Sequence, residues 1–133
     1  MYITLEEIIS NGERVAEYLE TREQVKLDNN PETIARIETF IGRNRGMLCG
    51  EMQYNWAVSF GYMIGQTIIK TYGGEWTYNE SMDQWGVMVP SFGWTNPIGN
   101  ANKCISSESD SINSFFEVIG LSIQKGGLDK LNG

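Results

Sequence analysis

The chain has 133 residues and a hydrophobic fraction of 41%, which suits one globular domain and excludes a disordered segment. Seventeen acidic residues against ten basic ones give a net charge of −7. Nucleic acid is therefore excluded as a favoured partner, because phosphate binding needs clustered lysines and arginines. The absence of histidine and the presence of only two, isolated cysteines exclude the common zinc patterns and histidine-dependent nucleophiles.

The cellular location is predicted from what the sequence lacks. It has no run of about 20 apolar residues, which a membrane-spanning helix needs. Its first ten residues are acidic and amphipathic, without the basic start of a secretory signal. We therefore expect a cytoplasmic protein that does not enter a membrane.

Two helices are predicted within residues 1–46, where they form a helical hairpin. Thr4 and Glu7 have the spacing of a capping box, so the first helix begins after Thr4. Asn30 and Pro31 supply the cap and the first position of the second helix. Residues 43–46, "RNRG", end that helix, because cations and glycine are favoured at helix C-termini.

One long, largely buried helix is predicted from Met47 to Gly74. Its apolar residues recur every four positions, which is a helical period; they are Leu48, Met52, Trp56, Phe60, Ile64 and Ile68. Ala57, Gly61 and Gly65 form a second row of small residues. We interpret this row as a place where another element packs close to the helix backbone, with a ligand-binding surface as the alternative.

A small antiparallel sheet of two or three strands follows the long helix. Aromatic and β-branched residues alternate on both sides of the polar segment "ESMD", which is typical of a hairpin; they are Trp76, Tyr78, Trp85, Val87 and Val89. Pro90 ends the second strand. Phe92 and Trp94 are candidates for a third strand.

Two C-terminal helices complete the predicted α+β fold. The first begins with Asn96 as cap and Pro97, and the second is capped by Asp110 and ends at Gly126 and Gly127.

The whole chain is predicted to be one domain, 1–133. Residues 1–46 form the N-terminal hairpin, residues 47–125 the central helix, sheet and C-terminal helices, and residues 126–133 a frayed tail.

Cys49 and Cys104 are each flanked by apolar residues in predicted helices, so we expect both to be buried. The sequence leaves open whether they meet, because a disulfide needs Cα atoms within about 7 Å.

No catalytic, cofactor-binding or metal-binding motif is recognisable in the chain. Glu51 and Glu75 are the semi-buried carboxylate candidates, but a glycosidase-like pair needs two such groups across a cleft. Nothing in their spacing requires a cleft, so solvent-exposed acids are the favoured interpretation. We therefore expect no enzyme activity, no cofactor and no metal.

The aromatic residues of the predicted sheet are candidates for a binding surface, because tryptophan and tyrosine are enriched in binding hot spots. Trp76 and Trp85 are expected in the core, and the segment with Phe92 and Trp94 is loop-like. The candidate binding residues are Trp94, Phe92, Tyr78, Glu75 and Glu51.

Four segments, "GYMIGQTIIKTYGGEW", "WGVMVP", "NPIGNANKCI" and "DSINSFFEVI", resemble a group of small uncharacterised bacterial domains. In that group a glycine-bearing helix ends in a Gly-Gly-x-Trp turn, and strands and an Asn-Pro helix start follow. The resemblance covers roughly residues 47–123. Some small acidic bacterial proteins of this style look like immunity proteins for secreted toxins, so the resemblance implies that function and supplies no catalytic residues.

These observations favour a non-enzymatic cytoplasmic binding protein, most specifically an acidic immunity or inhibitor-type protein that blocks a basic protein partner. One alternative is a small-molecule binder or carboxylate-using enzyme, with a pocket between the long helix and the sheet lined by Trp76, Trp85 and Glu51. Another is a structural or oligomerising domain that dimerises through the Gly61–Gly65 row or a free sheet edge. Monomer and homodimer are both left open.

Overall fold

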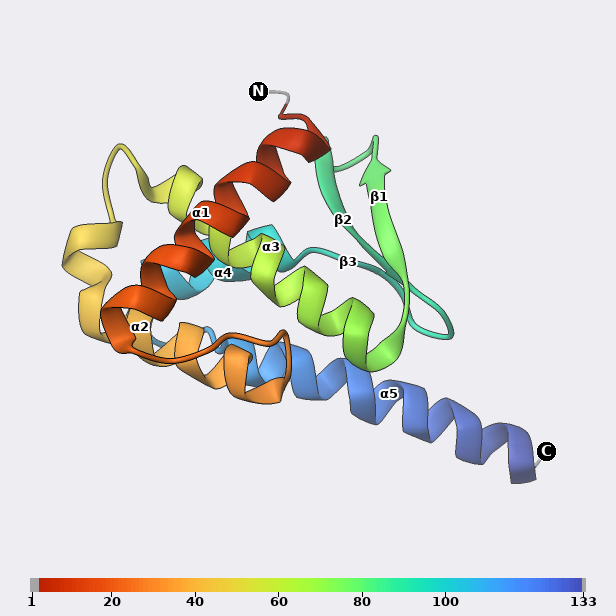
Figure 1. Cartoon of the computed structure of the whole chain (residues 1–133). Coiled ribbons are helices and arrows are strands. Elements are labelled where there is room, and N and C mark those ends of the chain that lie inside the picture. The colour runs from red at the N-terminus through yellow and green to blue at the C-terminus, as the bar shows by residue number, and fades with distance from the viewer. Residues whose placement is uncertain (1–2, 133) are drawn as a thin grey trace.

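The computed structural model describes the backbone of residues 3–132 and the side chains of residues 3–126. Over that part of the chain, five helices and a three-stranded antiparallel sheet form an α+β fold (Figure 1). In chain order the elements are α1 (Leu5–Glu23), α2 (Pro31–Leu48), α3 (Gln53–Tyr72), β1 (Glu75–Asn79), β2 (Gln84–Val89), β3 (Gly93–Thr95), α4 (Pro97–Ser106) and α5 (Ile112–Asn132). The predicted class, the order of helices and strands and the antiparallel sheet are confirmed.

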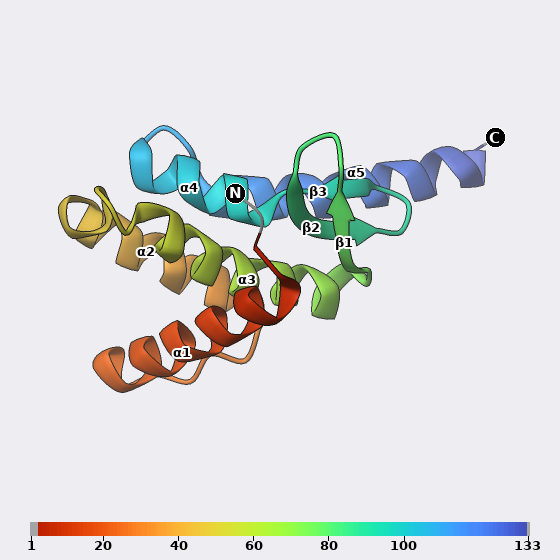
Figure 2. The same ribbon diagram turned by 90° about the horizontal axis from the view of Figure 1, so that it is seen from above.

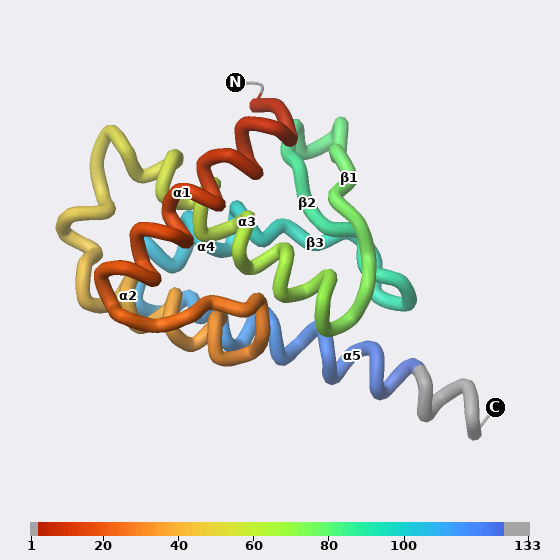
Figure 3. Tube along the Cα trace, viewed as in Figure 1, coloured from red at the N-terminus to blue at the C-terminus, as the bar shows by residue number. Residues whose placement is uncertain are grey.

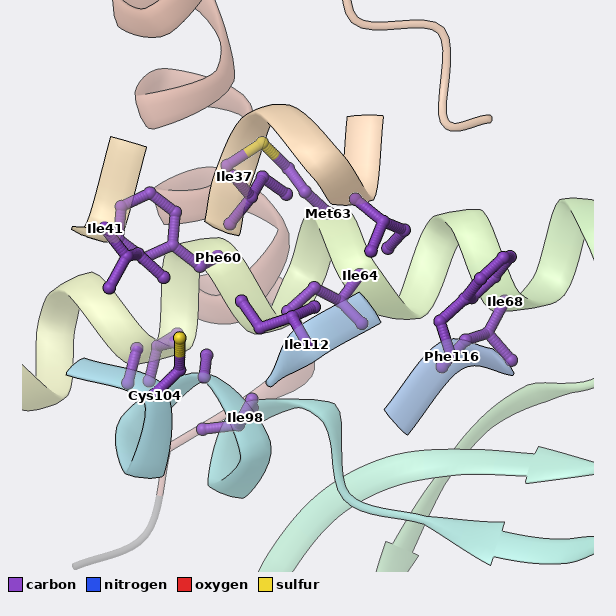
Figure 4. Close-up of a cluster of buried hydrophobic side chains, with 14 of the residues drawn as sticks. Ile37, Ile41, Phe60, Met63, Ile64, Ile68, Ile98, Cys104, Ile112 and Phe116 are labelled. Atoms are coloured by element: carbon purple, nitrogen blue, oxygen red, sulfur yellow. The ribbon is translucent and has the colours of Figure 1, made fainter. Parts of the chain in front are cut away.

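Helix α3 is the central element of the fold, since α1, α2, α4 and the sheet all contact it (Figures 1 and 2). Its buried face meets side chains of α2, α4 and α5 in one apolar cluster (Figure 4). Members of that cluster are Ile37, Ile41, Phe60, Met63, Ile64, Ile68, Ile98, Cys104, Ile112 and Phe116. Burying each large apolar side chain stabilises the fold by about 1.5–3 kcal/mol, so this cluster is its main source of stability.

The capping signals at the first two helices are confirmed. Thr4 Oγ1 accepts from the Glu7 amide at 3.1 Å, and the Glu7 carboxylate accepts from the Thr4 amide in return. Asn30 Oδ1 accepts from the Thr33 amide at 3.1 Å, so α2 begins at Pro31 as expected.

The predicted boundary between the second and third helices is wrong. Helix α2 does not end at residues 43–46 but is kinked at Asn44 and continues to Leu48, whose side chain is fully buried. Gly50, with φ of +123°, then reverses the chain, and α3 begins only at Gln53 (Figure 3). The reason is that burial of Leu48 holds the helix past Gly46, and the left-handed backbone that glycine adopts easily occurs at Gly50.

The small residues of α3 lie where other elements touch its backbone, as predicted. A Cβ atom on Gly61 would be 2.6 Å from the Cα atom of Ile98, at the start of α4. A Cβ atom on Gly65 would be 2.4 Å from the Trp76 ring of β1. The row is therefore covered inside the chain, which contradicts the alternative that it joins two copies.

The sheet has strand order β1-β2-β3, and its register gives it two different faces. One face turns toward α3 and carries the pair Trp76 and Val87 and the pair Tyr78 and Trp85. The other face, hereafter the uncovered sheet face, points away from α3, and there exposed Met88 lies between exposed Glu75 on β1 and half-buried Trp94 on β3.

The start of α5 is capped by two residues that the sequence pattern did not indicate. Ser111 Oγ, not Asp110, accepts from the Ser114 amide at 3.1 Å. From α2, the Glu38 carboxylate accepts from the Ile112 amide at 2.7 Å, from the Asn113 amide and from the Asn113 side chain. A side chain 74 positions earlier in the chain thus satisfies the free amides of this helix.

The end of α5 also differs from expectation. The helix does not stop at Gly126 and Gly127 but runs to Asn132, and Gly133 lies outside the described residues. Glycine inside a helix costs about 1 kcal/mol relative to alanine, which weakens a helix without ending it.

The close approach at Gly61 makes a direct prediction about stability. We expect Gly61→Ala to lower the free energy of unfolding by about 1–3 kcal/mol, because its methyl group requires the start of α4 to move. Gly46→Ala is the matched control: a Cβ there meets nothing within 4 Å, and we expect a gain of about 0.5–1 kcal/mol. Urea unfolding measures both, and equal effects of the two substitutions would contradict the packing described here.

The Glu38 cap predicts a specific dependence of stability on pH. Burial alone would raise the pKa of Glu38, but the hydrogen bonds from Ser111, Asn113 and the Ile112 amide outweigh it and lower the pKa below its ordinary value of 4.5. A carboxyl group with a lowered pKa stabilises the fold above its ordinary pKa, and this contribution is lost as the pH falls through the lowered value.

We therefore expect Glu38→Gln to cost about 0.5–2 kcal/mol at neutral pH, the usual range for a lost cap. The difference from the wild type should shrink below about pH 4.5, the ordinary value. Urea unfolding at several pH values measures this, with exposed Glu80→Gln as control. A difference that stays constant from neutral to acid pH would show that the charge of Glu38 is not responsible.

Candidate functional site

The five predicted binding residues lie in four separate places. Glu75 and Trp94 share the uncovered sheet face, Tyr78 is near the β1–β2 turn, and Phe92 is in the β2–β3 turn. Glu51 is in the exposed turn between α2 and α3. The structure therefore brings together only Glu75 and Trp94, on either side of Met88.

The uncovered sheet face combines an acidic and an apolar surface. Trp94 lies in β3, not in a loop, and its ring covers Gly86, where a Cβ would be 2.5 Å from the indole. Its Nε1 donates to the Thr77 carbonyl oxygen at 3.0 Å, so the half-buried ring is held in place. Met88 beside it is 42% exposed. This face offers a fixed aromatic ring, a flexible apolar side chain and the carboxylate of Glu75.

The opposite sheet face packs against the core, and there the two tryptophans that were predicted to line a pocket make packing and hydrogen-bond contacts. Trp76 stacks on Tyr62, with ring centres 6.1 Å apart, and its Nε1 donates to Gln66. Trp85 donates to the Ile3 carbonyl oxygen at 3.1 Å. Both tryptophans are half-buried and pack against the core, close to the core position expected for them. Glu51 lies outside this region.

Polar and aromatic groups also meet near the β1–β2 turn. The Tyr78 hydroxyl donates to the Asp83 carboxylate, and the Tyr54 hydroxyl donates to Gln84 Oε1 at 3.4 Å. Burial, with a smaller effect of the nearby Asp83 charge, raises the pKa of Tyr54. These contacts hold the turn, and Met82 at its tip is 59% exposed.

The two candidate carboxylates do not form a catalytic pair. Glu51 and Glu75 are both exposed, not semi-buried, and they belong to different elements. The reason is local: Glu51 falls in the turn that interrupts the predicted long helix, and Glu75 points away from α3 at the start of β1. Neither is held in the dry site that tunes a general acid.

Sequence reasoning missed a groove of about 360 Å³ between the β2–β3 turn, α4 and α5, hereafter the α4–α5 groove. Its lining combines apolar and polar side chains: Phe92, Asn100, Ser109, Asp110, Ser111, Ser114, Phe115, Val118 and Ile119. Only Phe92 was a predicted binding residue. The sequence pattern accounts for Asp110 as a helix cap, so it contains no separate signal for this site.

A second groove, of about 310 Å³, differs in charge from the first. It lies between α2 and the segment that joins α1 to α2, and its lining includes Glu23, Glu32, Arg36 and Arg43. Arg36 and Glu32 form an ion pair at 2.7 Å. Charges of both signs thus line this groove, whereas no basic side chain lines the α4–α5 groove.

The two cysteines differ from each other, and both are free. Cys104 is buried as predicted, and desolvation, with the Glu38 charge, raises the pKa of its thiol. Cys49 is exposed, contrary to expectation, because it follows the last residue of α2 and does not belong to α3. Its Sγ donates to the Ile105 carbonyl oxygen at 3.6 Å.

Two features are absent from the described part of the chain. Within it, no three histidine, cysteine, aspartate or glutamate residues gather in a way that would hold a metal ion. None of its helices combines the length and apolarity needed to cross a membrane.

Comparison with protein-family models, with curated proteins and with solved structures finds no match for this chain.

The exposure of the two thiols predicts different reactivity. We expect Cys49 to react with a disulfide reagent in the native protein, and Cys104 to react at least about a hundredfold more slowly, because its exposure needs local unfolding. The single variants Cys49→Ser and Cys104→Ser separate the two rates, and unfolded protein is the control in which both thiols react. Equal rates in the native protein would contradict the placement of Cys49.

Proposed function

We propose that the chain is a non-enzymatic cytoplasmic binding protein that engages a basic protein partner, most specifically as an immunity or inhibitor-type protein. The observation that carries this proposal is that most of the acidic side chains that the structure describes have no cationic partner. Among the described side chains there are two ion pairs, Lys26 with Asp28 at 4.0 Å and Arg36 with Glu32 at 2.7 Å. The excess of acidic residues in the sequence is therefore largely unpaired among the described side chains.

Helix α1 holds the largest share of this charge. It contains six glutamates and two arginines, a net charge of −4 out of the −7 of the whole chain. Its exposed acids are Glu6, Glu7, Glu13, Glu17 and Glu23. The helix lies at the outer edge of the helical layer (Figure 2). Such a surface attracts a basic partner from a distance and raises the association rate.

Exposed apolar side chains supply the contacts that charge alone does not. Three of these side chains are more than 40% exposed: Met88 on the sheet, and Met82 and Tyr54 near the β1–β2 turn. Trp94, beside Met88, is half-buried. Aromatic residues and methionine are enriched where protein interfaces are buried most deeply. The combination of unpaired acids with aromatic and methionine side chains supports a protein partner.

The two alternative functions have less support. The small-molecule or enzymatic alternative required a pocket lined by Trp76, Trp85 and Glu51, but the two tryptophans pack against the core and Glu51 is an exposed turn residue. The packing of Ile98 and Trp76 on the Gly61–Gly65 row counts against dimerisation through that row. The other form of that alternative is a dimer that pairs through a sheet edge. The strand order makes β1 and β3 the two edge strands.

The experiment is affinity capture of the tagged chain in lysate of its source organism, with a salt gradient and mass spectrometry of the eluate. We expect one basic protein that elutes with salt and whose association rate falls steeply as ionic strength rises. Glu13→Gln combined with Glu17→Gln should slow association with little change in dissociation. A folded bait that retains no protein, or a partner whose binding is insensitive to salt, would contradict the proposal.

A further inference from the structure

The α4–α5 groove contains a carboxylate that the fold does not use. The sequence pattern predicts Asp110 as the cap of α5, yet Ser111 occupies the cap position. Its carboxylate makes no hydrogen bond or ion pair with any described residue, while its side chain lines the groove. A carboxylate beside a groove that makes no such contact within the fold is available to bind a cation from outside the chain.

A second polar group in the groove is also unpartnered. Oδ1 of Asn100 is buried, and no donor among the described residues reaches it. A buried acceptor without a donor is unfavourable, because nothing compensates for the water that it loses. The χ2 torsion of asparagine has a broad distribution, so the side-chain amide of Asn100 can rotate and turn Oδ1 toward the groove. This rotation breaks no hydrogen bond of Oδ1, because that atom makes none with a described residue. A cation in the groove would supply the missing donor.

The remaining lining suits the aliphatic part and the charge of a basic side chain. Phe92 is 38% exposed and Val118 is 53% exposed, and with Phe115 they form an apolar wall. Phenylalanine rings also attract cations through their faces. The hydroxyls of Ser109, Ser111 and Ser114 add hydrogen-bond acceptors, and no basic side chain in the lining opposes a positive charge.

We infer that the α4–α5 groove binds a lysine or arginine side chain of the basic protein partner. The stem of that side chain packs on Phe92 and Val118, and its ammonium or guanidinium group donates to Asp110 and to Asn100 Oδ1. This assignment rests on the proposed function for the identity of the partner. The binding of a lysine or arginine side chain by the groove does not depend on that function, because it follows from the residues that line the groove.

The first experiment measures amide chemical shifts of the full chain while capped tripeptides with a central arginine, lysine or norleucine are added to millimolar concentration. We expect the arginine or lysine peptide to shift amides at Phe92, Asn100, Asp110 and Val118, and the norleucine peptide to have little effect. Equal shifts with norleucine, or shifts confined to other surfaces, would overturn the inference.

Matched variants test the role of the carboxylate. Asp110→Asn keeps the shape of the side chain and should weaken peptide binding by about tenfold. Glu108→Gln removes an exposed acid two positions away that does not line the groove, and it should leave binding unchanged. Val118→Arg, at an exposed position, should occupy the groove with its own guanidinium group and exclude the peptides. Undiminished binding in a folded Asp110→Asn or Val118→Arg variant would overturn the inference.

Two outcomes separate this inference from the proposed function. A captured basic protein that binds the Asp110→Asn variant as tightly as the wild type would overturn the groove assignment and leave the proposed function intact. Arginine peptides that bind the groove, in a chain that retains no basic protein, would support the assignment and contradict the proposed function. A further outcome concerns the groove assignment alone. Self-association that covers the groove and excludes the peptides would overturn that assignment and would identify a second copy of the chain as the occupant.

Discussion

The fold depends on how closely other elements approach the backbone of α3. At Gly61 the start of α4 lies where a Cβ atom would be, and at Gly65 the Trp76 ring does the same for the sheet. Both contacts bring their elements toward one helix from different positions along it, so the sheet and α4 share a single apolar cluster. This close packing also explains why the helix tolerates two glycines, since the packing they permit offsets a helix-propensity cost of about 1 kcal/mol each.

Much of this fold could be predicted from the sequence, because many of its elements begin or turn at contacts between neighbouring residues. The caps at Thr4 and Asn30, the hairpin around "ESMD" and the Asn96-Pro97 helix start all depend on residues within a few positions of one another. The wrong boundaries had a tertiary cause. Leu48 continues the four-residue spacing of the α3 stripe, yet it is buried as part of α2, and periodicity alone does not distinguish the two cases.

The binding surfaces were predicted less well than the fold, again for a physical reason. Spacing shows which aromatic residues are candidates, but exposure depends on which strand pairs with which. Trp94 became half-buried because β3 pairs with β2 and places the ring over Gly86. Asp110 became available because a glutamate from α2 and a neighbouring serine took over the helix start. Both events depend on contacts in three dimensions, strand pairing in one case and a side chain from α2 in the other, and spacing along the sequence does not show them.

The contact between Glu38 and the start of α5 also has a consequence for the order in which the chain folds. It joins residues 74 positions apart, so it forms only after both α2 and the start of α5 have been synthesised. Until then the apolar side chains of the cluster that Ile112 and Phe116 cover lie open to solvent. Helix α5 thus closes the core and is held by a charge from α2, which links the docking of this helix to completion of the core.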